Sequence, residues 1–350
     1  MLIIDTHLDM AYNAIMFNRN LDLEIAEIRA MEAGLEGRGD NTVSLPELRR
    51  ANAAVVVGTV FDRTLRPPDI EKGSTCQEIS YAKAQGQLAY YRVLAEQGKV
   101  RFLGDTPSLR AHIAAWEREP NAQPIGLIPA IEGADSIVWP EQVHAWKQQG
   151  LRMASLAHYG VSAYAHGNAS EGGLTPAGVT LLREMDAAGI ILDLSHLNDQ
   201  SFFEALDRFA GPVLASHSNC RALAPGERQL SDDQIRTLLA HGGMMGIVTA
   251  IWMLKPLSGE RDSFRASVTM EAVADHVDHV CQMAGNAEHV GIGSDLDGGF
   301  GNRGCPIDLD TFADLHRLAD ILRRRGYDEE QVKDVMYGNW ARFFAQAWSR

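Results

Sequence analysis

Short runs of apolar residues recur along the whole chain, and segments with helical periodicity separate most of them. Helices are predicted over residues 77–97, 140–149, 176–188, 199–209 and 232–241. The apolar runs have the length and aliphatic density of strands buried on both faces of a parallel sheet. There are eight of them, at residues 2–5, 54–60, 125–131, 151–157, 190–194, 213–216, 244–249 and 290–294. Alternating strands and helices are typical of βαβ units, so the pattern predicts an α/β fold, a (β/α)8 barrel.

Residues that commonly begin helices support the predicted helices, and two long segments between the predicted elements are interpreted as loops. Thr175 stands before Pro176, and Ser231 precedes two aspartates, which is how helices commonly begin. Residues 18–45 and 63–74 are predicted to be long loop insertions. The last part, residues 308–348, is predicted to form two helices.

The length of 350 residues would suit two average domains, but one barrel whose loops carry insertions reaches the same size. We therefore expect a single domain over residues 1–350. The formal charge of −14 argues against a nucleic-acid partner, because phosphate backbones attract clustered Lys and Arg. The sequence contains no run of 18 apolar residues that would predict a membrane span. The four scattered cysteines suit a reducing compartment, so we expect a cytoplasmic protein.

Polar side chains of one kind follow the predicted strands at the same point. At or just past the carboxyl ends of the apolar runs come His7 and Asp9, Glu132, His158, His196, His217 and Asp295. The carboxyl ends of all eight strands of such a barrel meet on one face, where active sites form. Residues that are far apart in the sequence are therefore predicted to be neighbours.

Each of these residues by itself is more often structural than functional. A single histidine at the end of a strand can serve only to form structural hydrogen bonds, and Asp295 or Asp297 can simply cap a turn. Six or seven such residues in the same position relative to a strand are hard to explain as separate accidents, so we interpret them as one site. Six other histidines fall within helical segments and are interpreted as structural: His112, His144, His241, His276, His279 and His316.

Histidine nitrogens and carboxylate oxygens suit Zn, Mn, Fe or Co. His7 and Asp9 are two residues apart, so on a strand both side chains lie on one face and can bind one ion. His196 and His217 can bind a second ion, and Glu132 can bridge the two. A water between two ions would then ionise near neutral pH, and the free carboxylate of Asp295 could take its proton.

The motifs "DTHLD", "IEGAD", "LAHYG", "LDLSH", "ASHSN" and "GSDLDG", in this order, resemble those of the renal (membrane) dipeptidase family of the amidohydrolase superfamily. The resemblance covers essentially the whole chain. It implies a distorted (β/α)8 TIM barrel with loop insertions. It also implies a binuclear zinc enzyme that hydrolyses dipeptides, L-Xaa-D-Xaa substrates among them, by means of a metal-bridging hydroxide.

The resemblance also implies roles for individual residues. His7, Asp9 and Glu132 correspond to the ligands of the first zinc, and Glu132, His196 and His217 to those of the second. Three further residues correspond to functional groups: Asp295 to the catalytic acid and base, His158 to the group that contacts the substrate carbonyl, and Arg228 to the arginine that binds the terminal carboxylate. A guanidinium fork is suited to that last role, because it can donate two parallel hydrogen bonds to a carboxylate.

The chain departs from the family pattern around the substrate pocket. Tyr159 stands where renal members usually have Asn, and Trp252 and Met253 stand near the position of a tyrosine. The substrate range is therefore open, and another amide hydrolase acting on cyclic amides, β-lactams or N-acyl amino acids is the alternative. A non-catalytic metal-binding barrel is a second one, which the complete ligand set disfavours. A homodimer is expected from the symmetry preference of soluble oligomers.

Overall fold

The computed structural model describes residues 1–65, 73–120, 122–257, 259 and 261–349. Its centre is a closed ring of parallel strands, in which β2 pairs with β4 to complete the circle. The strands of the ring are β1 Ile3–Leu8, β2 Ala53–Phe61, β4 Ile125–Glu132, β5 Met153–Ser155, β6 Ile191–Asp193, β7 Val213–Ala215, β8 Met244–Ile247 and β9 Val290–Ile292. Around the ring, each strand pairs with the next in this order, and β9 pairs with β1. The predicted (β/α)8 barrel and its eight strands are confirmed.

One additional short strand escaped the sequence prediction. It is β3, Val100–Phe102, which pairs in parallel with the first residues of β4, Ile125 to Leu127. The neighbour on that edge, β5, pairs with β4 only at Ala130 and Ile131. Because β3 has three residues and the middle one, Arg101, is exposed, the sequence contains no apolar run to mark it. This strand therefore occupies the part of the β4 edge that β5 does not reach.

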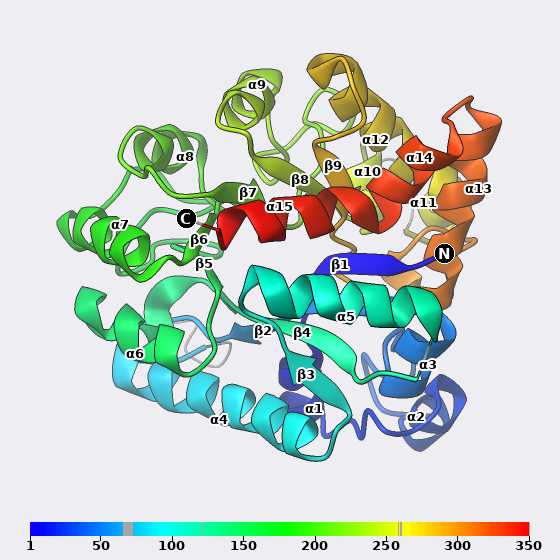
Figure 1. The fold of residues 1–350 in the computed structure, drawn as a ribbon, viewed down its shortest axis with the longest axis horizontal. Coiled ribbons are helices and arrows are strands. Elements are labelled where there is room, and N and C mark those ends of the chain that lie inside the picture. Colours follow the sequence, from blue (N-terminus) through cyan, green and yellow to red (C-terminus); the bar gives the residue numbers. More distant parts are fainter. Residues whose placement is uncertain (66–72, 121, 258, 260, 350) are drawn as a thin grey trace.

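The predicted helices form the outer layer of the barrel (Figure 1). The five predicted ones are α4 Gln77–Glu96, α6 Val143–Gln148, α7 Pro176–Ala188, α8 Asp199–Leu206 and α9 Asp232–Ala240. The layer also contains α5 Thr106–Arg118 and α12 Met270–Ala284, whose ranges were not predicted. A 3₁₀ turn, Pro140–Gln142, precedes α6. The N-caps form as the sequence suggests: Thr175 accepts a hydrogen bond from the amide of Gly178, and Ser231 accepts one from the amide of Gln234.

The loop insertion after β1 is ordered by a buried arginine. Between α1 (Met10–Met16) and α3 (Leu45–Arg50) this segment forms one helix, α2, Ile25–Met31. Arg19 donates to both carboxylate oxygens of Glu32, at 2.7 and 3.1 Å, and to Oδ1 of Asn13 at 2.7 Å. Because this arginine is buried with its acceptors, it fixes the insertion against the barrel. Most of the other predicted insertion, residues 63–74, lies outside the described residues.

The chain ends in helices that pack against β9 and α5. α13, His316–Arg324, is followed by α14, Glu329–Lys333, a π-helical turn, Asp334–Gly338, and α15, Asn339–Ala347. The side chain of Trp340 donates to the carbonyl of Ile292 in β9 at 3.0 Å. Thr106 donates to the carbonyl of Ala345 at 2.7 Å, and α15 and α5 lie side by side in Figure 1. The two predicted C-terminal helices are thus confirmed, the second one as a composite of three segments.

Two short helices, α10 Ile251–Leu254 and α11 Arg261–Ala266, fill the connection between β8 and α12. Among the described residues, no helix combines the length and apolar character needed to cross a membrane.

Candidate metal centre

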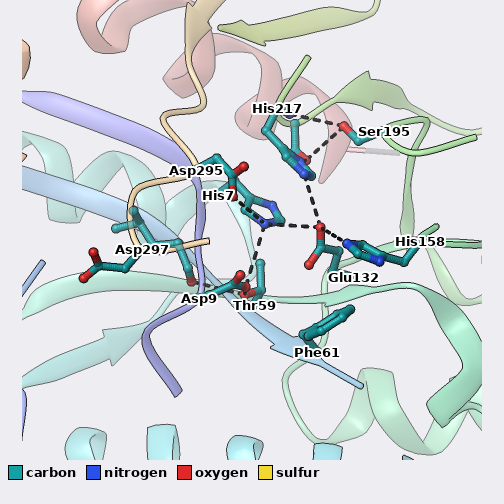
Figure 2. A network of polar contacts seen from close by, with 12 residues as sticks. His7, Asp9, Thr59, Phe61, Glu132, His158, Ser195, His217, Asp295 and Asp297 are labelled. Carbon is teal, nitrogen blue, oxygen red and sulfur yellow. Dashed lines mark hydrogen bonds and ion pairs between the residues drawn. The ribbon is translucent and has the colours of Figure 1, made fainter. Parts of the chain in front are cut away.

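The carboxyl ends of the strands bring the predicted site residues together at one mouth of the barrel (Figure 2). His7 lies within β1, and Glu132 is the last residue of β4. The others follow their strands within a few residues: His158 after β5, His196 after β6, His217 after β7 and Asp295 after β9. His7, Asp9, Glu132, His196 and His217 are buried, whereas His158 and Asp295 keep some exposure toward the mouth.

Glu132 lies at the centre of the cluster. Its Oε1 is 3.0 Å from Nε2 of His196, 3.2 Å from Nε2 of His217 and 3.6 Å from Nε2 of His7. The same oxygen is 3.7 Å from Nε2 of His158. One carboxylate therefore faces four imidazoles that come from four different strands, as Figure 2 shows for three of them.

His7 joins the remaining carboxylates to this centre. Its Nε2 is 3.8 Å from Oδ1 of Asp9 and 3.8 Å from Oδ1 of Asp295. The ring of His7 stacks on that of His217, with centroids 3.6 Å apart. Three groups of potential metal ligands result: His7, Asp9 and Glu132; Glu132, His196 and His217; and His7, His217 and Asp295.

A buried hydrogen-bond chain holds the ring of His217. Oγ of Ser216 lies 2.5 Å from Oδ2 of Asp193, to which it donates, and 2.7 Å from Nδ1 of His217. The single hydroxyl proton goes to the carboxylate, so Nδ1 of His217 must carry its own proton and donate to Ser216. Nε2 of His217 then carries a lone pair that faces Glu132 and, at 3.1 Å, Nε2 of His196, which is the tautomer a metal ligand needs.

Asp5 and Thr59 support the ligands on β1. Oδ1 of Asp5 accepts hydrogen bonds from the amides of His7, at 3.0 Å, and Ser294, at 3.1 Å, and so ties β1 to the end of β9. Burial raises the pKa of Asp5 to about 6. The hydroxyl of Thr59 donates to Oδ1 of Asp9. Sequence reasoning missed both residues, although Asp5 lies two positions before His7 and shares its side of the strand.

The backbone is strained where three of the polar residues follow their strands. His196, Asp295 and Asp297 have φ values of 67°, 60° and 62°, in the left-handed region that residues other than glycine rarely occupy. Asp297 turns away from the cluster in Figure 2, and its carboxylate accepts from the amides of Thr42 and Val43 at 2.8 and 3.0 Å. It therefore anchors the inserted loop and leaves Asp295 as the free carboxylate at the mouth.

The electrostatics of the cluster favour bound cations. Burial, followed by repulsion from Asp9 and Asp295, raises the pKa of Glu132 well above its usual range. Burial raises the pKa of Asp9 to about 6 and, together with the nearby carboxylate of Asp9, that of Asp295 well above its usual range. Desolvation of the charged carboxylates, with like-charge repulsion second, causes these shifts, and divalent ions between the carboxylates would reverse them.

The histidines are held in the neutral form that binds metal. Burial lowers the pKa of His7 to about 3 and places those of His196 and His217 well below the usual range, with the charge of Arg228 adding to the effect. Nε2 of His7 is buried and has no hydrogen-bond partner among the described residues. A buried, neutral and unpartnered imidazole nitrogen surrounded by carboxylates fits a divalent metal ion, so the residues present fit the ions that the sequence predicts.

A cavity of about 190 Å³ opens above the cluster. Arg228 lies on its wall, where it donates to the carbonyl of His217 at 2.8 Å and to Oγ of Ser218 at 3.3 Å. Its remaining N–H groups are thus held in place at the cavity. The residues that line the cavity are Asp9, Tyr12, Phe61, Glu132, His158, Tyr159, His196, Arg228, Trp252, Met253, Asp295, Gly298 and Gly299.

Sequence reasoning missed some residues at or next to this cavity. Tyr12 lies on α1, and Phe61 ends β2 with its ring centroid 4.7 Å from that of His158. Arg63, just past β2, has Nη1 3.5 Å from Nδ1 of His158. A polar residue that follows the apolar run of β2 could have been placed with the others by its position, as the ligands were.

Comparison with known proteins agrees with this geometry. A sequence profile of the family "Membrane dipeptidase (Peptidase family M19)" matches residues 1–349. An uncharacterised protein of Klebsiella pneumoniae, from the pqqA 5′ region, is 32% identical over 65% of this chain and 83% of its own length. Dipeptidase verJ of Clonostachys rogersoniana is 32% identical over 65% of this chain, and the match spans only 56% of that enzyme.

Among solved structures, a metallo peptidase from Rhodobacter sphaeroides has a similar fold. It superimposes with a TM-score of 0.80 and covers 99% of both chains at 23% identity. Its structure contains a phosphinate mimic of the dipeptide L-Ala-D-Ala.

Proposed function

The chain belongs to the membrane dipeptidase family of metallopeptidases, and from that premise we propose that it is a binuclear zinc dipeptidase that accepts L-Xaa-D-Xaa substrates. The observation that carries the proposal is the central position of Glu132. This carboxylate belongs to two groups of potential ligands, one with His7 and Asp9 and the other with His196 and His217. Two ions that share one carboxylate match this arrangement, and Mn, Co or Fe could replace zinc at such ligands.

When bound, the two ions would lower the pKa of a water molecule toward neutrality and polarise the peptide carbonyl. Asp295 would accept a proton from this water on a carboxylate oxygen and return it to the nitrogen of the leaving amine. Its exposure toward the cavity and its distance of 3.8 Å from His7 suit that transfer.

His158 would stabilise the oxygen that becomes negative as the carbonyl is attacked. Its Nδ1 faces the guanidinium of Arg63, which can only donate, so Nδ1 acts as the acceptor and Nε2 carries the proton. That Nε2–H points to the side of the ring where Glu132 lies, 3.7 Å away. A fixed donor aimed at the developing oxyanion contributes to catalysis, because it needs no reorganisation during the reaction.

Arg228 would bind the terminal carboxylate of the substrate and so restrict the enzyme to short peptides. The cavity of about 190 Å³ has room for a small dipeptide. The phosphinate mimic of L-Ala-D-Ala in the Rhodobacter sphaeroides structure supports a D-residue at the second position. A single domain, a cytoplasmic location and a homodimer stay predictions of the sequence.

The proposal is tested by initial rates on L-Xaa-L-Xaa and L-Xaa-D-Xaa dipeptides, with zinc-loaded and chelator-treated protein side by side. We expect cleavage that depends on metal, and two metal equivalents per chain in elemental analysis. Absence of dipeptide cleavage by protein that contains two equivalents would contradict the proposal and direct the search to other amides.

The role of Asp295 has its own test within this assay. Replacement by Asn keeps the size of the side chain and removes the basic oxygen, so metal content should stay at two equivalents while kcat falls by about 100-fold or more. Turnover close to the wild-type rate would assign proton transfer to another group.

A further inference from the structure

The position of Arg63 places a second guanidinium across the mouth of the barrel from Arg228. Arg63 lies just past the end of β2, and Arg228 lies in the loop that follows β7. Going round the ring in either direction, β7 is the fourth strand from β2. The two arginines therefore extend from opposite sides of the barrel, with β5 and its residue His158 between them on one side of the ring.

Arg63 has no counter-ion in the part of the chain that the structure describes. Its Nη1 makes only long contacts, 3.5 Å to Nδ1 of His158 and 3.5 Å to the carbonyl of Tyr159. Its Nε is buried and has no hydrogen-bond acceptor. The buried Nε–H has lost hydration without gaining an acceptor, and the positive charge has no anionic partner among the described residues, which is unfavourable unless a ligand supplies one.

Among the described residues, two carboxylates lie on or beside the chain neighbours of Arg63, and both are engaged elsewhere. Asp62 accepts hydrogen bonds from Ser74 at 2.6 Å and from Lys83 at 3.2 Å. Asp135 accepts from Thr64 and Ser162, at 2.9 and 2.7 Å. Neither carboxylate is left to neutralise Arg63.

The positive charge of Arg63 reaches the cavity. Burial, and next the charge of Arg63, lower the pKa of His158 well below its usual range. The same charge acts on Tyr12. Burial and the carboxylates of Asp9 and Asp62 raise the pKa of Tyr12, and the charge of Arg63 partly offsets this increase. Both Tyr12 and His158 line the cavity, so a ligand there experiences the field of Arg63 as well.

We propose that Arg63 determines specificity by binding an acidic side chain on the amino-terminal residue of the dipeptide, so that Asp-Xaa and Glu-Xaa are preferred substrates. The inference rests on the proposed function. When Arg228 binds the terminal carboxylate and His158 faces the scissile carbonyl, the amino-terminal residue extends toward the opposite side of the mouth, where Arg63 lies. Its planar fork can donate two hydrogen bonds to a carboxylate.

The test compares L-Glu-D-Ala with L-Gln-D-Ala, and the same pair with L-Ala at the second position. Glu and Gln have the same shape and differ in charge, so the ratio of their kcat/KM values isolates the charge of the side chain. We expect the wild-type enzyme to prefer Glu by about tenfold or more, as for one charge-assisted interaction. Arg63→Gln should bring this ratio close to one, and Arg63→Glu should shift the preference to L-Lys-D-Ala.

Two controls separate this inference from its premise. Arg110→Gln removes an exposed arginine from α5 and should leave the ratio unchanged. Binding of both dipeptides to the metal-loaded Asp295→Asn variant is measured by calorimetry, and there the preference for Glu should appear without turnover.

The outcomes are distinct. A wild-type enzyme that cleaves or binds both peptides equally, or a ratio that survives in Arg63→Gln, overturns the inference and leaves the dipeptidase in place. Preferential binding of Glu that depends on Arg63, in protein that cleaves no dipeptide, supports the role of Arg63 and contradicts the proposed function. Failure to bind or cleave either peptide overturns both.

Discussion

Single residues in this site are held by partners that sequence reasoning did not single out. The predicted ligand His217 owes its orientation to two buried residues, Ser216, which directly follows β7, and Asp193, the last residue of the neighbouring strand β6. Such a partner fixes both the ring and the tautomer of a metal ligand, and its loss typically weakens metal binding by about 10–100-fold. The serine is therefore as much a part of the candidate metal centre as the histidine.

Replacement of Ser216 by Ala should lower the affinity for the metal ion that His196 and His217 would hold by about 10–100-fold, because Nδ1 of His217 loses its acceptor. Competition with a chelator measures this affinity directly. Ser201→Ala is the matched control, since Ser201 is also buried and its Oγ has no hydrogen-bond partner. An affinity within about threefold of the wild type in Ser216→Ala would show that the ring is oriented by packing alone.

At the scale of secondary-structure elements, a buried histidine joins the loop after β7 to two helices. His276, on α12, accepts a hydrogen bond on Nδ1 from the amide of Cys220 at 3.0 Å. Its Nε2 then carries the proton and donates to the carbonyl of Leu254, at the end of α10, at 3.1 Å. Both bonds need the neutral ring, and burial accordingly lowers the pKa of His276 to about 4. The sequence placed this residue on a helix and interpreted it as structural, which the geometry matches.

The contribution of His276 to stability should disappear in acid. The ordinary pKa of histidine is 6.5, and the pKa of His276 in the folded chain is about 4. Between pH 6.5 and pH 4 the unfolded chain therefore binds a proton at this residue that the folded chain does not, so the free energy of unfolding decreases as the pH falls through this window. The loss amounts to at most about 1.4 kcal/mol per pH unit.

Urea unfolding of metal-free protein at pH 7 and pH 5 measures the effect. His276→Gln can keep both hydrogen bonds and cannot titrate in this range, so it should lose less free energy of unfolding than the wild type between the two pH values. The exposed His241 supplies the control variant, His241→Gln, which should behave like the wild type. Equal pH dependence in all three proteins would contradict the assigned role.

At the scale of the whole molecule, the closed ring of strands collects ligands from β1, β4, β6 and β7 at one mouth. Each of these strands also bears core residues, so the metal centre and the barrel stabilise one another. The ligands lie close together only in the folded chain, so the ions bind the folded state and not the unfolded one. Their binding free energy therefore adds to the free energy of unfolding.

Removal of the ions should therefore lower the melting temperature. An ion present at 100 times its Kd contributes about 2.7 kcal/mol, which corresponds to roughly 4 °C for a chain of this size. Calorimetry before and after chelation, with metal analysis of the same samples, measures the change. Glu132→Gln, which weakens both ligand groups, should respond little to the chelator. An unchanged melting temperature in protein that has lost its metal would contradict the coupling.

The sequence by itself determined the features that depend on neighbours along the chain. Apolar runs and helical periodicity marked the eight strands and the main helices, since burial on both faces leaves a continuous apolar pattern. The position of His7, Glu132 and Asp295 relative to their strands was sufficient to predict one site, because barrel strands end on one face. The family resemblance added the role of Arg228, which composition and spacing do not indicate.

Only the tertiary structure decided which distant residues meet. The pairing of β3 with β4 depends on how far β5 reaches, and the chain from Asp193 through Ser216 to His217 depends on the register of two strands. The opposite positions of Arg63 and Arg228 follow from the closing of the ring between β2 and β4. These relations arise from contacts between segments far apart in the sequence, and no local pattern of residues records them.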